Sequence, residues 1–319
     1  MAQKTHCSPA KQTNEQAVWR RQRSRLEAID YRNWRTGAKG FGFYRFKHQA
    51  IVLFGELLKV CGLYKYGYRN ACDLGLGQLE VLVDRLPLGF AGYRILHLSD
   101  LHLDSLDGLG DRIASRIREA RYDICVMTGD YRFARHGAFQ KLLPELARIV
   151  AAVDRPGRIY GVLGNHDTQA MVPPLERIGI RILANQSVIL QKDGDALQLT
   201  GVDDPHDYLT PMAIRSMKLS GSHCKVLLAH SPELYQPAEA CGFSLYLCGH
   251  THGGQICLPG GIAILTFTNT GRHFYRGLWR YGAMAGHTSP GCGAVKIPIR
   301  FNCPPEITVL KLRSKPSAA

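Results

Sequence analysis

The pattern of apolar and polar residues changes near residue 79 of this chain. From there on, short apolar runs of strand length alternate with segments whose apolar residues recur at helical spacing, which is typical of an α/β domain. The late runs are separated by short loops, which favours a mixed sheet or a pair of sheets. We expect helices over 109–120, 139–153 and 174–178, and strands over 79–83, 94–98, 124–127, 159–163, 180–184, 188–190, 197–202, 226–229, 245–248, 262–267 and 307–312.

The chain before residue 79 has a different character. Residues 1–15 are polar, and we expect them to be disordered. A basic helix is predicted over 16–35, because three glycines soon after residue 36 would end it. A second, amphipathic helix is predicted over 48–64. The thin apolar stripe of the first helix consists of Trp19, Leu26 and Ile29.

The net charge of the chain is +14, and it is unevenly spread. Residues 1–47 carry a net +8, so the charge is concentrated ahead of the α/β pattern. Such a segment can bind anionic lipid or nucleic acid, or it can be a solvated tail. The segment 16–64 leaves two alternatives open, a location in the lipid interface or packing on the core. No run of 18 apolar residues exists, so we expect no bilayer-spanning segment.

These patterns divide the chain into four parts. We expect a disordered tail over 1–15, a basic helical extension over 16–78, a catalytic domain over 79–312 and a loose tail over 313–319. The ten cysteines contain no Cys-x-x-Cys pair, which fits a reducing cytosol. Cys125 and Cys248 lie in apolar runs and are predicted to be core residues.

Five short motifs rich in Asp, Asn and His each follow an apolar, strand-like run. Ligands of α/β sheets collect beyond the carboxyl ends of the strands, so the five motifs can converge on one point. Neighbouring glycines allow the backbone to approach that point closely. The motifs are Ser-Asp-Leu-His at 99–102, Thr-Gly-Asp at 128–130, Gly-Asn-His-Asp at 164–167, Ala-His-Ser at 229–231 and Gly-His-Thr-His-Gly-Gly at 249–254.

The residue types of the motifs indicate metal chemistry. Carboxylate, amide and imidazole ligands without a thiolate favour Mn, Fe or Zn in a non-structural site. Asp100 and His102 are two residues apart and can reach one metal, whereas His250 and His252 can reach two neighbouring metals. Two adjacent divalent ions can clamp an in-line displacement at phosphorus and activate a bridging water. The motifs therefore predict a dinuclear phosphate-ester hydrolase.

The series of motifs resembles the calcineurin-like metallophosphoesterase superfamily over about residues 90–312. The longer form Gly-His-Thr-His-Gly-Gly-Gln-Ile at 249–256 is similar to the bacterial, membrane-associated subgroup of the YaeI and YkuE type. The resemblance implies a four-layer αββα sandwich of two mixed sheets. No ligand type that the superfamily requires is missing, which argues against a scaffold that has lost its metals.

The resemblance also implies roles for single residues. One metal would be held by Asp100, His102, Asp130 and His252. The other would be held by Asp130, Asn165, His230 and His250, with Asp130 bridging and Mn the expected ion. His166 resembles the general acid that approaches the leaving-group oxygen, and Asp167 would orient it.

The substrate is less closely defined than the reaction. The resemblance implies hydrolysis of a phosphodiester or pyrophosphate by a metal-bridging hydroxide, on a lipid-linked substrate such as UDP-2,3-diacylglucosamine of lipid A biosynthesis. A cytoplasmic protein, peripheral on the inner face of the membrane, would suit such a substrate. The alternative is a soluble phosphodiesterase or nuclease, although most of the basic charge lies outside the catalytic domain and nucleic acid is not the expected partner. Three basic residues, Arg272, His273 and Arg276, are candidates for phosphate binding, or form a solvated loop.

Overall fold

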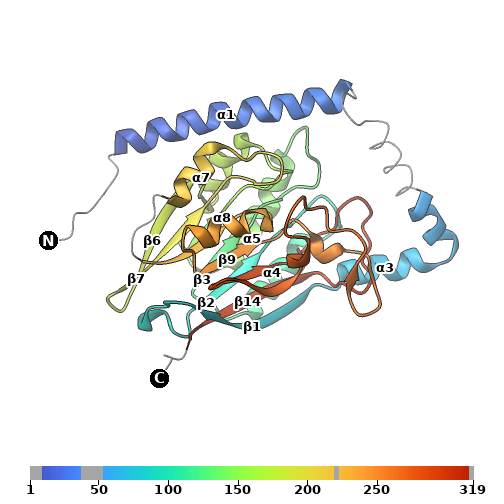
Figure 1. The fold of residues 1–319 in the computed structure, drawn as a ribbon. Coiled ribbons are helices and arrows are strands. Elements are labelled where there is room, and N and C mark those ends of the chain that lie inside the picture. Colours follow the sequence, from blue (N-terminus) through green and yellow to red (C-terminus); the bar gives the residue numbers. More distant parts are fainter. Residues whose placement is uncertain (1–8, 37–52, 219–222, 316–319) are drawn as a thin grey trace.

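Two six-stranded β-sheets form the centre of the protein (Figure 1). The computed structural model describes residues 9–36, 53–218 and 223–315. Each sheet combines parallel and antiparallel pairs, so both are mixed. The two sheets face each other across an apolar interior to which residues of both contribute.

The first sheet has the strand order β1-β14-β2-β3-β4-β5. Strands β2 to β5 are parallel neighbours, whereas β14 runs antiparallel to β2 and parallel to β1. The parallel arrangement brings the carboxyl ends of β2, β3 and β4 to one edge. The strands are β1 (Gly75–Val83), β2 (Arg94–Leu98), β3 (Ile124–Met127), β4 (Ile159–Gly161), β5 (Arg181–Ile182) and β14 (Glu306–Ser314).

The second sheet has the order β12-β13-β9-β8-β7-β6. Its four inner strands are parallel and its two edge strands are antiparallel to their neighbours. This arrangement places the carboxyl ends of β8 and β9 side by side. The strands are β6 (Gln186–Lys192), β7 (Asp195–Gly201), β8 (Cys224–Leu228), β9 (Leu245–Cys248), β12 (Gly277–Tyr281) and β13 (Met284–Thr288).

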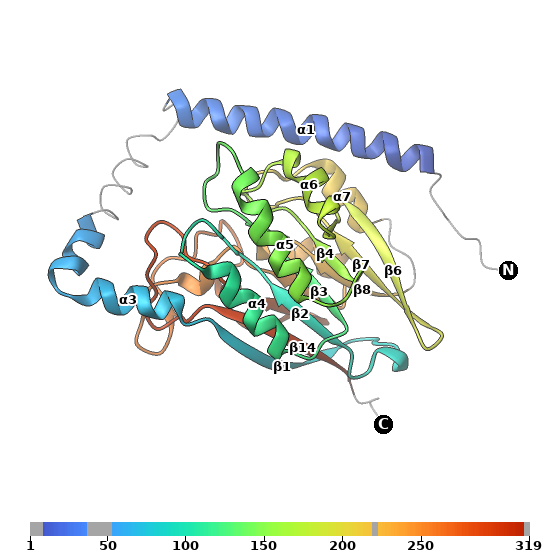
Figure 2. The same cartoon turned by 180° about the vertical axis from the view of Figure 1, so that it is seen from behind.

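Helices cover the outer face of each sheet and complete four layers. Figure 2 shows α4 (Leu109–Glu119), α5 (Leu143–Ala152) and α6 (Val172–Arg177) on the first sheet, where their buried side chains join one apolar cluster. Figure 1 shows α7 (Pro211–Lys218) and α8 (Tyr235–Ala240) on the second sheet. Alternate residues of a strand point to opposite faces, and this is how Ile95 reaches the interior while Leu96 faces the helices. The expected αββα sandwich of two mixed sheets is confirmed.

Short elements connect these layers. The hairpin of β10 (Cys257–Leu258) and β11 (Ile262–Ala263) lies outside both sheets. Single-turn 3₁₀ helices are η1 (Leu88–Phe90), η2 (Gln140–Leu142), η3 (Gln169–Met171), η4 (Pro232–Leu234), η5 (His252–Gly254) and η6 (Arg272–Phe274).

The strand predicted over 262–267 is wrong beyond Ala263. Ile264, Leu265 and Phe267 are exposed, so this apolar run does not enter a sheet. The second sheet instead ends with the β12–β13 hairpin, whose residues have no long apolar run. The two short helices α7 and α8 were likewise not predicted.

The N-terminal segment forms helices on both sides of a gap in the described residues. Helix α1 (Pro9–Thr36) begins within the stretch 1–15 that we expect to be disordered, and proline is favoured in a first helical turn. The segment predicted as one helix over 48–64 contains a helix over 53–60, and α3 (Leu63–Cys72) follows it. Gly62 adopts a left-handed conformation (φ 73°), which explains the break. At the other end, β14 runs to Ser314, into the tail expected to be loose from 313.

The contacts of α1 differ from those that its apolar stripe predicts. Trp19 is fully buried, but Ile29 is about half exposed. The other fully buried side chain on this helix, within its described part, is the cation Arg23. The sequence left open whether the extension lies in the lipid interface or packs on the core. For α1 the structure shows packing on the core. None of the described helices is both long enough and apolar enough to span a bilayer.

Candidate metal centre

The five motifs meet where five strands end. The loops after β2, β3 and β4 come from the first sheet, and those after β8 and β9 come from the second. Backbone bonds join adjacent loops, as between Asp100 N and Gly129 O (3.0 Å) and between Gly249 N and His230 O (2.7 Å). Seven buried side chains are brought together, namely Asp100, His102, Asp130, Asn165, His230, His250 and His252.

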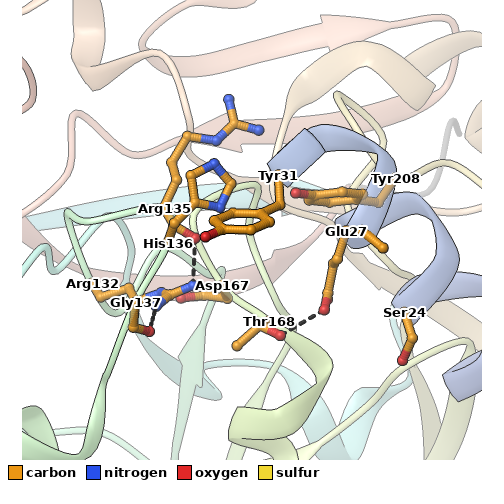
Figure 3. A pocket seen from close by; sticks show the side chains of 11 residues that line it. Ser24, Glu27, Tyr31, Arg132, Arg135, His136, Gly137, Asp167, Thr168 and Tyr208 are labelled. Carbon is orange, nitrogen blue, oxygen red and sulfur yellow. Dashed lines mark hydrogen bonds between the residues drawn. The ribbon is translucent and has the colours of Figure 1, made fainter. Parts of the chain in front are cut away.

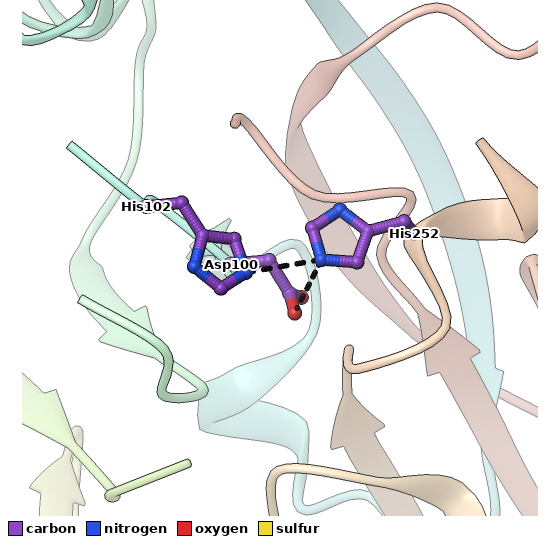
Figure 4. A group of neighbouring side chains, drawn as sticks. All are labelled: Asp100, His102 and His252. Atoms are coloured by element: carbon purple, nitrogen blue, oxygen red, sulfur yellow. Dashed lines mark hydrogen bonds and ion pairs between the residues drawn. The ribbon is translucent and has the colours of Figure 1, made fainter. Parts of the chain in front are cut away.

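One part of the cluster consists of Asp100, His102 and His252 (Figure 4). The Nε2 atoms of His102 and His252 lie 3.1 Å apart, and Nε2 of His252 lies 3.4 Å from Oδ1 of Asp100. The Nδ1 atom of His102 donates to the carbonyl oxygen of Arg132 (2.8 Å), so a neutral ring presents the lone pair of Nε2 to the cluster.

A second part consists of Asn165, His230 and His250. Oδ1 of Asn165 lies 3.1 Å from Nε2 of His230 and 3.2 Å from Nδ1 of His250. The carbonyl of Thr128 accepts from Nδ1 of His230 (2.7 Å), and the carbonyl of Phe267 accepts from Nε2 of His250 (3.1 Å). In neutral rings, the nitrogens that face Asn165 are therefore both acceptors, so the three atoms are placed to bind a cation.

Asp130 lies between these two parts. Its Oδ2 atom is 3.5 Å from Nε2 of His102 and 3.3 Å from Nε2 of His230. Its Oδ1 atom accepts from the backbone N–H of His166 (2.8 Å), which leaves Oδ2 directed at the two rings. This carboxylate is placed to face two cations at once.

The chemistry of this donor set fits divalent metal ions. The rings offer nitrogen lone pairs, and backbone carbonyls hold the opposite nitrogens, as is usual for metal-binding histidine. Carboxylate and amide oxygens complete the set, which suits Mn, Fe or Zn.

Backbone strain is concentrated at the same residues. Asp100, His102, Asp130, His250 and His252 all have positive φ, between 38° and 72°. This left-handed conformation is uncommon outside glycine and costs about 1–3 kcal/mol at each such residue. It persists where the surroundings impose it, which is typical of functional sites.

Two glycines allow the loops to come this close. A Cβ atom on Gly249 would collide with Ser99 Oγ and Asp100 Oδ2, and one on Gly164 would collide with Asp130. Both positions therefore require close backbone approach, as the sequence indicates.

Burial and charge set the protonation of the cluster. Burial opposes ionisation of Asp130, but the neighbouring His230 and His166 outweigh it and hold the pKa of this carboxyl well below its usual value. Burial lowers the pKa of His166 and of His250 to about 3. Burial also opposes a charge on His230, yet Asp130 raises the pKa of this ring well above its usual value. A proton on His230 thus supplies the positive charge that the cluster needs when no metal is bound.

The expected role of Asp167 requires a correction. Nδ1 of His166 is bound to the carbonyl oxygen of Phe133, so this carbonyl orients the ring. Oδ2 of Asp167 instead accepts from the backbone N–H groups of Asp130 and Gly164 (2.8 Å each), and Oδ1 accepts from Tyr131 N (3.0 Å). Asp167 therefore fixes the loop that carries Asp130.

The three basic candidates for phosphate binding lie in different surroundings. Arg276 packs against the motif loop, because a Cβ on Gly253 would lie 3.0 Å from its Cδ. The ring of His273 packs on Phe274 (3.9 Å between centroids), and Arg272 is exposed. Only Arg276 of these three has a described contact with the loop over 249–254.

The sequence analysis missed a segment that lines the cluster. The ring of His206 lies 4.2 Å from that of His250, and Oδ2 of Asp207 accepts from Nδ2 of Asn165 (3.2 Å). Asp203, Asp204, His206 and Asp207 follow β7 directly. Acidic residues and a histidine just after a strand are the same signal as in the five motifs, and could have identified this segment.

This chain is similar in sequence to known proteins. A family model described as calcineurin-like phosphoesterase matches residues 93–254. The uncharacterized metallophosphoesterase YkuE of Bacillus subtilis (strain 168) is 30% identical over 72% of this chain and 82% of its own length. The phosphodiesterase YaeI of Escherichia coli (strain K12) is 28% identical over 77% of this chain and 92% of its own length. A transmembrane protein with metallophosphoesterase domain of Danio rerio is 28% identical over 78% of this chain and 60% of its own length.

Proposed function

This chain belongs to the calcineurin-like phosphoesterase family, and we propose that it hydrolyses a phosphodiester or pyrophosphate with a pair of divalent metal ions. The observation that carries this proposal is the group of facing acceptors, Asn165 Oδ1, His230 Nε2 and His250 Nδ1, at 3.1–3.2 Å. The second group of facing side chains, Asp100, His102 and His252, supports a second ion. Bound divalent ions supply polarisation of the phosphoryl oxygens and a water that ionises near neutral pH.

The ligand assignment follows the two parts of the cluster. One ion would be held by Asp100, His102, Asp130 and His252. The other ion would be held by Asp130, Asn165, His230 and His250, and Asp130 would be the shared ligand. Manganese is the proposed ion, with iron or zinc as alternatives of similar ligand preference.

His166 is the residue proposed to move a proton to the leaving-group oxygen. Its Nδ1 atom is held by the Phe133 carbonyl, and its Nε2 atom lies 4.0 Å from Oδ2 of Asp130. This nitrogen therefore faces the place where phosphate and both ions would meet. Arg276, against the loop over 249–254, is proposed to hold a phosphate oxygen, whereas Arg272 and His273 have no such contact to support that role.

An exposed apolar surface supports a lipid-linked substrate. On the segment 53–66 the side chains of Leu53 and Val60 are 71% and 86% exposed. Exposed apolar residues also follow β11, and the same loop reaches the cluster through the Phe267 carbonyl. These two segments lie near each other in both views (Figures 1 and 2). Phe301 connects them: its ring centroid lies 6.0 Å from that of Tyr66, and its backbone forms a parallel β-bridge with Ile256.

The substrate proposed for this surface is a lipid-linked phosphate, such as UDP-2,3-diacylglucosamine of lipid A biosynthesis. The acyl chains would lie on the apolar segments while the phosphates reach the metal centre. The excess of basic residues would favour the anionic inner face of the cytoplasmic membrane. Because α1 packs on the core, the membrane contact is assigned to 53–66 and 258–267 rather than to 16–35.

The reaction class is tested by a substrate screen. Purified full-length protein with added Mn²⁺ is assayed against bis(p-nitrophenyl) phosphate, UDP-2,3-diacylglucosamine, cyclic nucleotides and single-stranded DNA. Cleavage of the first compound that disappears with EDTA supports the phosphoesterase, and faster cleavage of the second supports the lipid-linked substrate. Faster cleavage of nucleotides or DNA would instead support a soluble phosphodiesterase or nuclease.

The membrane contact has its own test. Co-sedimentation with vesicles of phosphatidylglycerol and phosphatidylethanolamine is compared for the wild type and for a Leu57→Ser, Val60→Ser double variant. Both side chains are exposed, so the fold should be unaffected, and binding should fall. A Leu88→Ser, Ile189→Ser variant is the matched control, because these exposed apolar side chains lie on other elements. Equal binding of all three proteins would contradict the proposed surface.

A further inference from the structure

A buried arginine of the N-terminal helix is bonded to the loop that carries two residues of the proposed centre. Arg23 of α1 has no exposed surface. Its Nη2 atom donates to the carbonyl oxygens of Gly164 (3.1 Å) and Asp167 (2.8 Å). These two carbonyls flank Asn165 and His166 in the sequence, so one guanidinium holds both ends of the motif over 164–167.

The rest of the guanidinium is held just as firmly. Nη1 of Arg23 is paired with Oδ1 of the buried Asp203, and Nε donates to Oε1 of Glu27 (2.8 Å). Burial opposes the charge, but Asp203 and Glu27 outweigh it and raise the pKa of Arg23 above its usual value. A planar fork with several fixed donors can satisfy two carbonyls and two carboxylates together, which a lysine ammonium cannot do.

The loop passes this constraint on to the shared carboxylate. The side chain of Asp167 accepts from the backbone N–H groups of Asp130 and Tyr131. Its own carbonyl is one of the two that Arg23 holds. A shift of Asp167 would therefore move Asn165, His166 and the backbone of Asp130 together.

Neighbouring residues of α1 reinforce the same contact. Nε1 of Trp19 donates to Oδ2 of Asp203 (2.6 Å), which fixes the carboxylate that pairs with Arg23. Glu27 accepts from Thr168 Oγ1 (2.6 Å) and from Gln169 N (2.8 Å), directly after the motif. Figure 3 shows the hydrogen bond between Glu27 of α1 and Thr168. Both residues line a cavity of about 280 Å³.

The buried contact between α1 and the loops around the cluster is mainly polar. Trp19 is the one apolar side chain of the described part of α1 that is buried, and it too makes a hydrogen bond. The helix therefore contributes little to the apolar core, and its specific bonds are made to the loops around the cluster. This pattern indicates positioning rather than general stabilisation.

From these contacts we infer that Arg23 is a positioning residue, which makes α1 part of the catalytic unit by holding the loop over 164–167 in its metal-binding geometry. The inference builds on the proposed metal centre. It does not depend on which phosphate ester is the substrate.

The test compares Arg23→Ala, Arg23→Lys and the control Arg25→Ala, since Arg25 is exposed on the same helix. Hydrogen exchange of the metal-free proteins is followed by mass spectrometry. Arg23→Ala should exchange faster in peptides that cover 162–170, with strands β8 and β9 unchanged. Faster exchange in all segments alike, or no change near 164–167, would overturn the inference.

Metal content and kinetics supply the second readout. In Arg23→Ala, affinity for Mn²⁺ at one of the two sites should fall about 10–100-fold, as is usual when a group that supports a ligand is lost. With bis(p-nitrophenyl) phosphate, kcat should fall while KM stays nearly constant, and free guanidinium should restore part of the loss. If Arg23→Ala does not fold, Arg23→Lys decides, because it keeps the charge but loses the fork. A Lys variant with wild-type metal affinity and kcat would overturn the inference.

These readouts separate this inference from the proposed function. Hydrogen exchange needs neither metal nor substrate. If the loop over 164–167 exchanges faster in Arg23→Ala but the wild type is inactive, the positioning role of Arg23 is supported and the proposed phosphoesterase activity is contradicted. If the wild type is active but the loop is unchanged in Arg23→Ala, the activity is supported and the positioning role is contradicted.

Discussion

Oδ1 of Asn165 lies 3.1 Å from Nε2 of His230, although the Thr128 carbonyl accepts from the other nitrogen of this ring. In a neutral ring both facing atoms are acceptors, so the pair is placed to bind a cation. The two residues come from different sheets, on the loops after β4 and β8. A cation bound at this point would join the two halves of the sandwich.

Metal removal should therefore destabilise the protein. Treatment with EDTA is expected to lower the melting temperature, and excess Mn²⁺ to restore it, because an ion that binds only the folded state stabilises it by mass action. Differential scanning calorimetry measures both steps, with Ca²⁺ as the control, since it prefers oxygen ligands alone. A melting temperature that does not respond to EDTA or Mn²⁺ would contradict the assigned centre.

Replacing Asp130 by Asn should abolish hydrolysis. The carboxylate faces His102 and His230 at 3.5 and 3.3 Å, and its charge would balance two ions. Metal analysis of Asp130→Asn should show that both sites are weakened. The control is Asp123→Asn, since this carboxylate accepts from Arg94 N on the surface, away from the cluster. Retention of both ions by Asp130→Asn would show that the residue is not shared.

Replacing His166 by Ala should leave the metals bound and slow turnover. Its Nε2 atom is 4.0 Å from Asp130 Oδ2, farther than the nitrogens of His102 and His230. The loss of proton transfer should lower kcat about 10²–10⁴-fold. A substrate whose leaving group needs no proton, such as p-nitrophenyl phosphate esters, should be less affected than an alkyl ester. Loss of metal in this variant would mean that His166 is a ligand instead.

Replacing Gly249 by Ala should disturb the centre by sterics alone. The added methyl group would collide with Ser99 and Asp100, at a cost of about 1–3 kcal/mol in the free energy of unfolding. Chemical denaturation and metal analysis should both register the change. Gly75→Ala is the matched control, because its methyl group would lie at an ordinary 3.5 Å from Pro305 O. Equal stability of the two variants would contradict the close packing of the loops.

The pair of Glu233 and His206 should stabilise the metal-free protein in a defined range of pH. Burial opposes the charge on Glu233, but the hydrogen bond from His206 outweighs it and lowers the pKa of Glu233 to about 2. Its contribution is therefore present above about pH 4.5 and lost as the pH falls toward 2. Burial likewise opposes the charge on His206, yet Glu233 and Asp207 raise the pKa of this ring, so its contribution is lost as the pH rises through the raised value.

The comparison of Glu233→Gln with the wild type checks this range. The difference in unfolding free energy should be largest between about pH 4.5 and 6.5, where both groups are charged. Glu119→Gln is the control, because its pair with Arg116 is exposed and contributes little. A difference that does not vary with pH would show that the loss is one of packing.

The sequence by itself determined the local features of this protein. Apolar runs of four or five residues placed β2, β3 and β9 with their correct bounds, since a buried strand must be apolar throughout. The motifs after them predicted a cluster of Asp, Asn and His, because the carboxyl ends of parallel strands meet at one edge. The seven cluster residues themselves were implied by the resemblance of these motifs to the superfamily.

Only the tertiary structure decided which distant groups support those residues. Whether Phe133 or Asp167 orients His166 depends on how two loops cross, and no sequence pattern records that crossing. Arg23 is a basic residue among many in α1, and its burial follows from a helix that docks by hydrogen bonds to carbonyls more than 140 residues away. Apolar periodicity reports which residues leave water, but such polar contacts have no period, so they become visible only when the chain is folded.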